Sequence, residues 1–247
     1  MNGHDLLKDK IVVVTAAAGT GIGSATAKRC LEEGATVIIS DWHERRLKET
    51  HDKLGTHHAI PCDVTNEQQV QTLINDTVER FGRIDVMVNN AGLGGEKSVL
   101  DMTDDEWSRV LDVTLNGTFR CTRAALRQMV AQRSGVVVNN ASVIGWRAQK
   151  GQAHYAAAKA GVMALTRCAA MDVAEHGIRV NAVAPSLAAH PFLAKVTSEE
   201  LLTELASREA FGRAAEPWEV ANVIVFLASD YSSYMTGEIV SVSSQHP

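Results

Sequence analysis

KIVVVTAAAGTGIG, residues 10–23, places a β-branched apolar run directly before a turn rich in glycine. The run predicts a short buried strand, and the residues from the turn to Glu33 carry a helical pattern. Gly19, Gly21 and Gly23 allow the backbone to approach a pyrophosphate closely, and the helix that follows offers unpaired N–H groups at its N-terminus. A glycine turn alone is weak evidence, but strand, turn and helix in this order favour a dinucleotide-binding unit.

The second expected strand covers 35–40 and ends at Asp41, about twenty residues after the glycine turn. An acid there is the usual partner of the adenine ribose diol, whereas the simpler interpretation is a solvated aspartate at a strand end. Asp41 would repel a 2′-phosphate, so the sequence favours NAD over NADP as the cofactor. Arg45 and Arg46 could bind such a phosphate, but we expect them on the outer face of the next helix.

Strands and helices alternate along the rest of the chain, without an internal repeat or a linker. This alternation predicts one α/β domain over 1–247, a Rossmann fold with a doubly wound parallel sheet of seven strands in the order 3-2-1-4-5-6-7 and helices on both faces. Further strands are expected at 57–62, 84–88, 135–140, 178–184 and 235–243, and helices at 42–54, 66–81, 103–131, 153–170 and 216–228. The segment 187–212 shows no strand pattern and is the candidate for a substrate lid.

A reactive cluster is predicted at the carboxyl edge of this sheet. The strand over 135–140 leads to Ser142, and Tyr155 and Lys159 lie four residues apart on one face of the next helix. A phenol with an ordinary pKa near 10 exchanges protons poorly at neutral pH, and we expect Lys159 to lower the pKa of Tyr155. Tyr155 would then exchange a proton with a secondary alcohol or a carbonyl, while Ser142 binds the same oxygen.

Composition narrows the function classes. The chain has 247 residues, 45% of them hydrophobic and 21% charged, with a net charge of −5, which is typical of a soluble domain and offers no basic patch for nucleic acid. It has no apolar run of about 18 residues, and residues 1–10 do not resemble a signal peptide, so we expect a cytoplasmic protein without a membrane partner.

Metal and redox sites are not expected. His51, His57 and His58 have no Glu or Cys at ligand spacing, so the sequence predicts no metal. The cysteines lack Cys-x-x-Cys spacing and are interpreted as small buried hydrophobic residues. They are Cys30, Cys62, Cys121 and Cys168.

Several of these motifs together resemble the short-chain dehydrogenase/reductase family over the whole chain. The matching features are the turn from Thr15 to Gly23, the acid Asp63, the Asn-Asn-Ala-Gly run from Asn89 to Gly92, and the residues Ser142, Tyr155 and Lys159. The resemblance implies an NAD(P)-dependent enzyme that assembles as a homotetramer through the helices over 103–131 and 152–176. The cofactor-binding residues that we expect are Thr15, Gly19, Thr20, Gly21, Ile22, Asp41, Asp63, Val64, Asn90, Ala91, Gly92, Tyr155, Lys159, Pro185 and Ala188.

The chain departs from the family pattern at four places, one of which is Ser186, where the family usually has a glycine after Pro185. The glycine turn is one residue longer than usual, with alanines where the first glycine would lie, which predicts a pyrophosphate loop of a different shape. Thr114 stands where the family has an asparagine whose main-chain carbonyl holds a relay water, and Asn116 lies on another helix face. His190 stands where many members have a threonine near the nicotinamide.

Within the family, segments such as ISDWHERRL and NNASVIGWRAQ resemble dehydrogenases of actinobacterial steroid catabolism, which act on a methylated hydroindanone propionyl-CoA. A 3-oxoacyl thioester reductase is the alternative enzyme, and a cofactor-binding regulator without turnover is a remote one. Trp146 offers a broad face to a fused ring, although it could equally pack under the lid or in a subunit contact. The expected substrate contacts are Leu93, Val143, Trp146, Leu187 and His190.

Overall fold

The sheet of the computed structural model, which describes residues 3–189 and 199–244, has the predicted order β3-β2-β1-β4-β5-β6-β7 with every pair parallel. The predicted single α/β domain and strand order are therefore confirmed. The strands are β1 (Ile11–Val14), β2 (Thr36–Asp41), β3 (His58–Pro61), β4 (Val86–Asn89), β5 (Gly135–Asn140), β6 (Ile178–Pro185) and β7 (Ile239–Val242).

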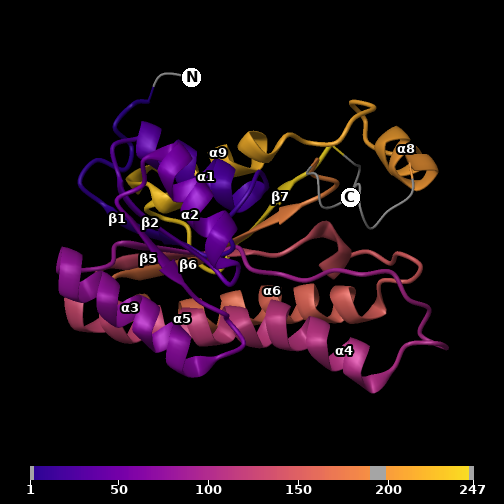
Figure 1. Ribbon diagram of the computed structural model, residues 1–247, viewed down its shortest axis with the longest axis horizontal. Coiled ribbons are helices and arrows are strands. Elements are labelled where there is room, and N and C mark those ends of the chain that lie inside the picture. Colours follow the sequence, from indigo (N-terminus) through magenta and orange to yellow (C-terminus); the bar gives the residue numbers. More distant parts are fainter. Residues whose placement is uncertain (1–2, 190–198, 245–247) are drawn as a thin grey trace.

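Helices cover both faces of the sheet, with α1, α2 and α9 on one side and α3 to α6 on the other (Figure 1). Neighbouring strand residues point to opposite faces, so Val12 packs toward the first helix layer and Val13 toward the second. Both faces are buried, which explains why the strands are continuously apolar. The helices are α1 (Ile22–Glu32), α2 (Glu44–Leu54), α3 (Glu67–Phe81), α4 (Asp104–Leu111), α5 (Gly117–Gln132), α6 (Ala153–Val173), α8 (Glu199–Ser207) and α9 (Pro217–Ala228).

The long helix expected over 103–131 is interrupted beside the sheet edge. Thr103 and Glu106 form the capping box that opens α4. A π-helical turn over Asp112–Asn116 then separates α4 from α5. Such single turns often occur at functional sites because they redirect the side chains of one helical turn. Here the turn carries Thr114, which is fully buried.

Two expectations from the sequence are wrong in detail. The last strand begins at Ile239 rather than 235, because Gly237 adopts φ +77° and bends the chain where its N–H bonds to the carbonyl of Val180. Cys168 is exposed on α6 and not buried, because the helix turns that residue away from the sheet. The other three cysteines are buried as expected.

The described part of the chain holds neither a helix able to cross a membrane nor a cluster of metal ligands. Within residues 3–189 and 199–244, no helix combines the length and the apolar character that crossing a membrane requires. Over the same ranges, no three His, Cys, Asp or Glu side chains gather as a metal site would require.

Candidate active site

A cavity of about 530 Å³ lies at the carboxyl edge of the sheet. Three elements bring the predicted cluster to its wall: the segment after β5 carries Ser142, the first turn of α6 carries Tyr155, and the next turn carries Lys159. Parallel strands end at a common edge, so residues distant in sequence meet there. The end of β6 contributes Pro185 to the same wall.

The Ser142 hydroxyl lies beside the Tyr155 phenol, close enough to lower the pKa of that phenol by hydrogen bonding. Ser142 is buried, and its Oγ also donates to the carbonyl of Pro185 at 3.4 Å and accepts the N–H of Ile144 at 3.3 Å. These bonds hold the hydroxyl in place against the phenol. Two hydroxyl groups therefore face one region of the cavity, where both could bind a substrate oxygen.

Lys159 is only 3% exposed, and its Nζ donates to the main-chain carbonyl of Asn140. Its Nζ lies 5.5 Å from the centroid of the Tyr155 ring. Burial lowers the pKa of Lys159 from its ordinary 10.5 to about 7, since an ammonium is poorly solvated there. Near neutral pH, Lys159 is therefore only partly protonated.

The expectation that Lys159 lowers the pKa of Tyr155 is wrong. Burial raises the pKa of Tyr155 to about 12, and the hydrogen bond with Ser142 only partly opposes the rise. The physical reason is that both groups are buried, so each loses solvation of its charged form. The lysine that should stabilise a phenolate is itself only partly protonated at neutral pH.

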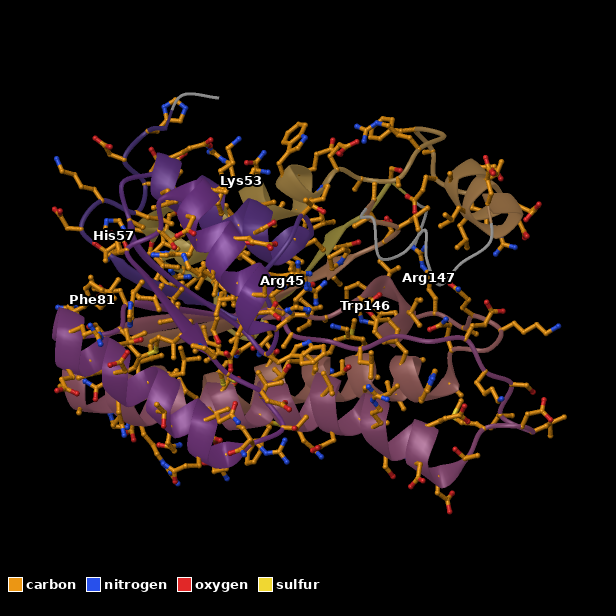
Figure 2. The ribbon with its side chains drawn as sticks, viewed as in Figure 1. Arg45, Lys53, His57, Phe81, Trp146 and Arg147 are labelled. Atoms are coloured by element: carbon orange, nitrogen blue, oxygen red, sulfur yellow. The ribbon has the colours of Figure 1, made fainter. Side chains whose placement is uncertain are left out.

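A second cavity, of about 880 Å³, lies on the far side of the glycine turn. Asp41 lines it, and its carboxylate accepts the N–H of His43 at 3.0 Å and the N–H of Ala18 at 3.2 Å. Arg46 lines this cavity too, so it lies closer to the ribose side than we expected, although it is exposed on α2. Arg45 does extend outward on α2, where it pairs with Glu49 (Figure 2).

The turn between β1 and α1 fits an anionic ligand. Gly21 is the N-cap of α1 and makes no side-chain capping bond, so the first N–H groups of the helix lack a side-chain acceptor. Ala16, where the family has its first glycine, adopts φ +49°, and Gly19 adopts φ +95°. The left-handed conformation of Ala16 is one that alanine disfavours, and the different loop shape stays a prediction.

The structure places most of the expected cofactor residues at the two cavities. Thr20 is exposed and lines neither cavity, whereas Thr15 is buried and bonds through Oγ1 to the carbonyl of Val88. Gly19 also lines neither, so these three positions belong to the turn and not to a cavity wall. The residues at the walls are Gly21, Ile22, Asp41, Asp63, Val64, Asn90, Ala91, Gly92, Tyr155, Lys159, Pro185 and Ala188.

The expected substrate contacts are only partly brought together. Val143 and Leu187 line the first cavity, whereas Leu93 lines the second. Trp146 lines neither cavity and is 51% exposed, because the 3-10 turn over Val143–Gly145 directs it outward. The prediction that it forms the pocket wall is corrected accordingly. His190 lies outside the described residues.

Sequence reasoning missed three groups at the first cavity. Arg147 lines it from the loop before α6, and Arg208 from the turn just after α8. Asn140, the last residue of β5, lines it as well. A polar side chain ending an otherwise apolar strand was the available signal for Asn140. No sequence signal pointed to the two arginines, because their loops follow no periodic pattern.

Thr114 clamps the loop that follows β4. Its Oγ1 accepts the N–H of Leu93 at 3.0 Å and donates to the carbonyl of Leu93 at 3.2 Å. Its own main-chain carbonyl, the group that a relay water would need, accepts the hydroxyl of Thr118 at 2.8 Å. The relay therefore stays a prediction.

Comparison with known proteins agrees with this geometry. A protein of Mycobacterium tuberculosis named (5R,7aS)-5-hydroxy-7a-methyl-1-oxo-2,3,5,6,7,7a-hexahydro-1H-indene-carboxyl-CoA reductase is 66% identical, over 99% of this chain and 96% of its own length. A 3-oxoacyl-[acyl-carrier-protein] reductase of Thermotoga maritima is 40% identical, over 96% of this chain and 97% of its own. The crystal structure of a short chain dehydrogenase from Mycobacterium smegmatis matches with a TM-score of 0.89 at 60% identity, covering 100% of this chain and 97% of that chain.

The family model described as enoyl-(acyl carrier protein) reductase matches residues 16–244, which takes in both cavities and the Ser142, Tyr155 and Lys159 cluster. Together with the relatives above, this match identifies the family. The chain belongs to the short-chain dehydrogenase/reductase family, whose members are oxidoreductases that use a nicotinamide cofactor.

Proposed function

We propose that this protein interconverts a secondary alcohol and a ketone on a methylated hydroindanone that carries a CoA thioester, with NAD as the cofactor. The 66% identity to a relative named for that class of substrate carries the proposal. The name of the relative places a carboxyl-CoA on the bicycle, whereas the sequence resemblance suggested a propionyl-CoA. We therefore propose the carboxyl thioester.

The side chains of the first cavity suit this reaction. When bound, the nicotinamide supplies or accepts the hydride at the reacting carbon. Tyr155 takes the proton from the alcohol oxygen, or returns it to the ketone, and Ser142 donates a hydrogen bond to that oxygen. Lys159, anchored on the carbonyl of Asn140, supplies a positive charge that favours the phenolate when the lysine is protonated.

Asp41 supports NAD rather than NADP. Its carboxylate lies at the wall of the second cavity, held by two main-chain N–H groups, so it has no freedom to move away from a 2′-phosphate. Both oxygens keep lone pairs that can accept hydrogen bonds from a ribose diol. Arg46 at the same cavity is the residue that could weaken this preference.

Two arginines support a CoA ester. Arg147 and Arg208 line the first cavity together with apolar residues such as Val143 and Ile144. A fused ring would pack on the apolar part, and the phosphates of CoA are anions that guanidinium groups bind well. Arg208 directly follows α8 and pairs with Glu204 on that helix, so it would bind a phosphate as part of that charged pair.

A 3-oxoacyl thioester reductase is the second candidate. The 40% identical relative of Thermotoga maritima, named a 3-oxoacyl-[acyl-carrier-protein] reductase, favours it. Both candidates need the same proton chemistry and differ only in the shape of the substrate. The third reading, a regulator without turnover, is disfavoured because Ser142, Tyr155 and Lys159 all reach one cavity.

One assay tests the proposal. The purified protein is given NAD with hydroindanol carboxyl-CoA esters, their free acids and linear 3-hydroxyacyl-CoA esters, and NADH formation is followed; the reverse reaction uses the matching ketones with NADH. We expect turnover of the bicyclic ester in both directions. Turnover of the linear ester alone would support the second candidate, and no turnover of any substrate would support the regulator.

We also propose a cytoplasmic homotetramer and a substrate lid over 187–212. Phe119 on α5 and Met171 on α6 are exposed apolar side chains on the helices that the family resemblance assigns to subunit contacts. The described start of the proposed lid is hydrogen-bonded to the segment that follows the lid. The N–H of Ala189 donates to the carbonyl of Ala215, and the N–H of Ala215 donates to the carbonyl of Leu187. Light scattering at micromolar concentration tests the tetramer, and a monomer would refute it.

A further inference from the structure

Asn140 connects the two halves of the site. Its main-chain carbonyl accepts the Nζ of Lys159, and its side-chain Nδ2 donates to Oδ1 of Asn90 at 2.9 Å. The residue is 9% exposed and lines the first cavity. None of the motifs that led to the dinucleotide site includes it.

The orientation of both amides follows from their partners. The amide nitrogen of Asn90 donates to the carbonyl of Ala16 at 3.1 Å and approaches that of Thr15 at 3.3 Å. Carbonyls only accept, so the amide nitrogen of Asn90 must face the turn and its oxygen must face Asn140. Asn140 must then present its own amide nitrogen, and its Oδ1 is left over.

The amide of Asn90 is packed tightly against the turn. A Cβ added at Gly23 would come within 2.6 Å of the Asn90 Nδ2 and 2.4 Å of the Ala16 oxygen. Glycine at that position therefore admits the amide between the turn and the start of α1. Any rotation of Asn90 would be transmitted to Ala16 and Gly23.

One atom in this arrangement destabilises the folded protein. The Oδ1 of Asn140 is buried and has no hydrogen-bond partner among residues 3–189 and 199–244. A buried acceptor without a partner destabilises the folded state. The neighbouring Asn139 differs, since its Nδ2 donates to Thr166 at 2.9 Å and its Oδ1 accepts from Asn89 at 2.8 Å. Stability alone therefore explains why position 139 is an asparagine, but not why position 140 is one.

The turn at Ala16 requires stabilising contacts from residues outside it. Ala16 adopts φ +49°, a left-handed conformation that alanine disfavours. The bond from Asn90 to the Ala16 carbonyl holds that conformation, and Asn140 holds Asn90. We propose that Asn140 is a positioning residue for the nicotinamide dinucleotide, which acts by fixing Asn90 and through it the shape of the Ala16 turn. The inference rests on the proposed function only through the dinucleotide and not through the choice of substrate.

The test is a titration with NADH alone, read by its fluorescence, beside a thermal melt. For Asn140→Val we expect Kd to rise about 5-fold, the equivalent of one net hydrogen bond, while Tm stays level or rises. In turnover assays KM for the dinucleotide should rise more than kcat falls. The matched control Asn139→Val should lower Tm, because it removes one buried hydrogen bond each from Asn89 and Thr166, with Kd within about 2-fold of the wild type.

A double-mutant cycle tests the route through the turn. Ala16→Gly removes the conformational strain, so in that background Asn140→Val should change Kd by less than about 2-fold. Asn140→Ala removes the same donor and replaces Asn140→Val in both measurements if the valine variant does not fold. A lower Tm with unchanged Kd, or an equal loss in both backgrounds, would overturn the inference. If the wild type itself does not bind NADH, the proposed function fails instead.

Discussion

Strand ends and loops build the two sides of the site, and they hold their side chains by different means. On the dinucleotide side, Asp41 ends β2 and is fixed by two main-chain N–H groups, and Asn90 is fixed by the turn. On the substrate side, Arg147 extends from a loop and Arg208 from the turn just after α8. Changes on the dinucleotide side, or to the proton-transferring Tyr155, should therefore affect every substrate, whereas changes to these arginines should depend on the substrate.

The largest expected effect is that of Tyr155→Phe. Loss of the acid/base hydroxyl should lower kcat about 1,000-fold for every substrate, since proton transfer by a positioned side chain contributes on that order. The Kd for NADH should change little, because the ring remains. The exposed Tyr234 provides the control Tyr234→Phe, which should retain wild-type turnover. Turnover of Tyr155→Phe close to the wild type would remove the tyrosine from the mechanism.

The next effect is on the pH dependence of stability. The pKa of Lys159 is about 7 in the folded state and 10.5 ordinarily, so between these values only the unfolded chain holds the proton. Stability should rise with pH in this window, on the order of 2 kcal/mol between about pH 7 and pH 9. Urea unfolding of Lys159→Met should lack this rise, whereas the exposed-site variant Lys53→Met should keep it. A rise of equal size in Lys159→Met would contradict the buried, weakly basic lysine.

Cofactor choice should change with Asp41→Ala. Removal of the carboxylate takes away both the ribose acceptor and the repulsion of a 2′-phosphate, so the ratio of kcat/KM for NAD over NADP should fall about 10-fold or more. Arg46→Ala, at the same cavity, should leave the ratio unchanged or raise it. An unchanged ratio in Asp41→Ala would place the ribose elsewhere.

The smallest expected effect sharpens the substrate side. Arg147→Ala should raise KM for the CoA ester about 5-fold and leave the free acid nearly unchanged, because only the ester carries phosphates. Trp146→Ala, the neighbouring exposed residue, should change both by less than about 2-fold. A loss in Trp146→Ala confined to the bicyclic substrate would restore the tryptophan to the pocket wall.

The same contrast explains what could be predicted from the sequence. Strand order and the meeting of Ser142, Tyr155 and Lys159 follow from period, helical spacing and the common edge of parallel strands, all of which are local rules. Trp146 was misplaced because the direction of a side chain leaving a 3-10 turn depends on tertiary packing. The raised pKa of Tyr155 depends on burial, which spacing does not report.

The most direct measurement compares kcat/KM for the hydroindanol carboxyl-CoA ester and for a linear 3-hydroxyacyl-CoA, both with saturating NAD. We predict a preference for the bicyclic ester of about 100-fold, since a cavity shaped for a fused ring discriminates by a few kcal/mol of transition-state binding. Equal values, or a preference for the linear ester, would contradict the proposed substrate and leave only the family activity in place.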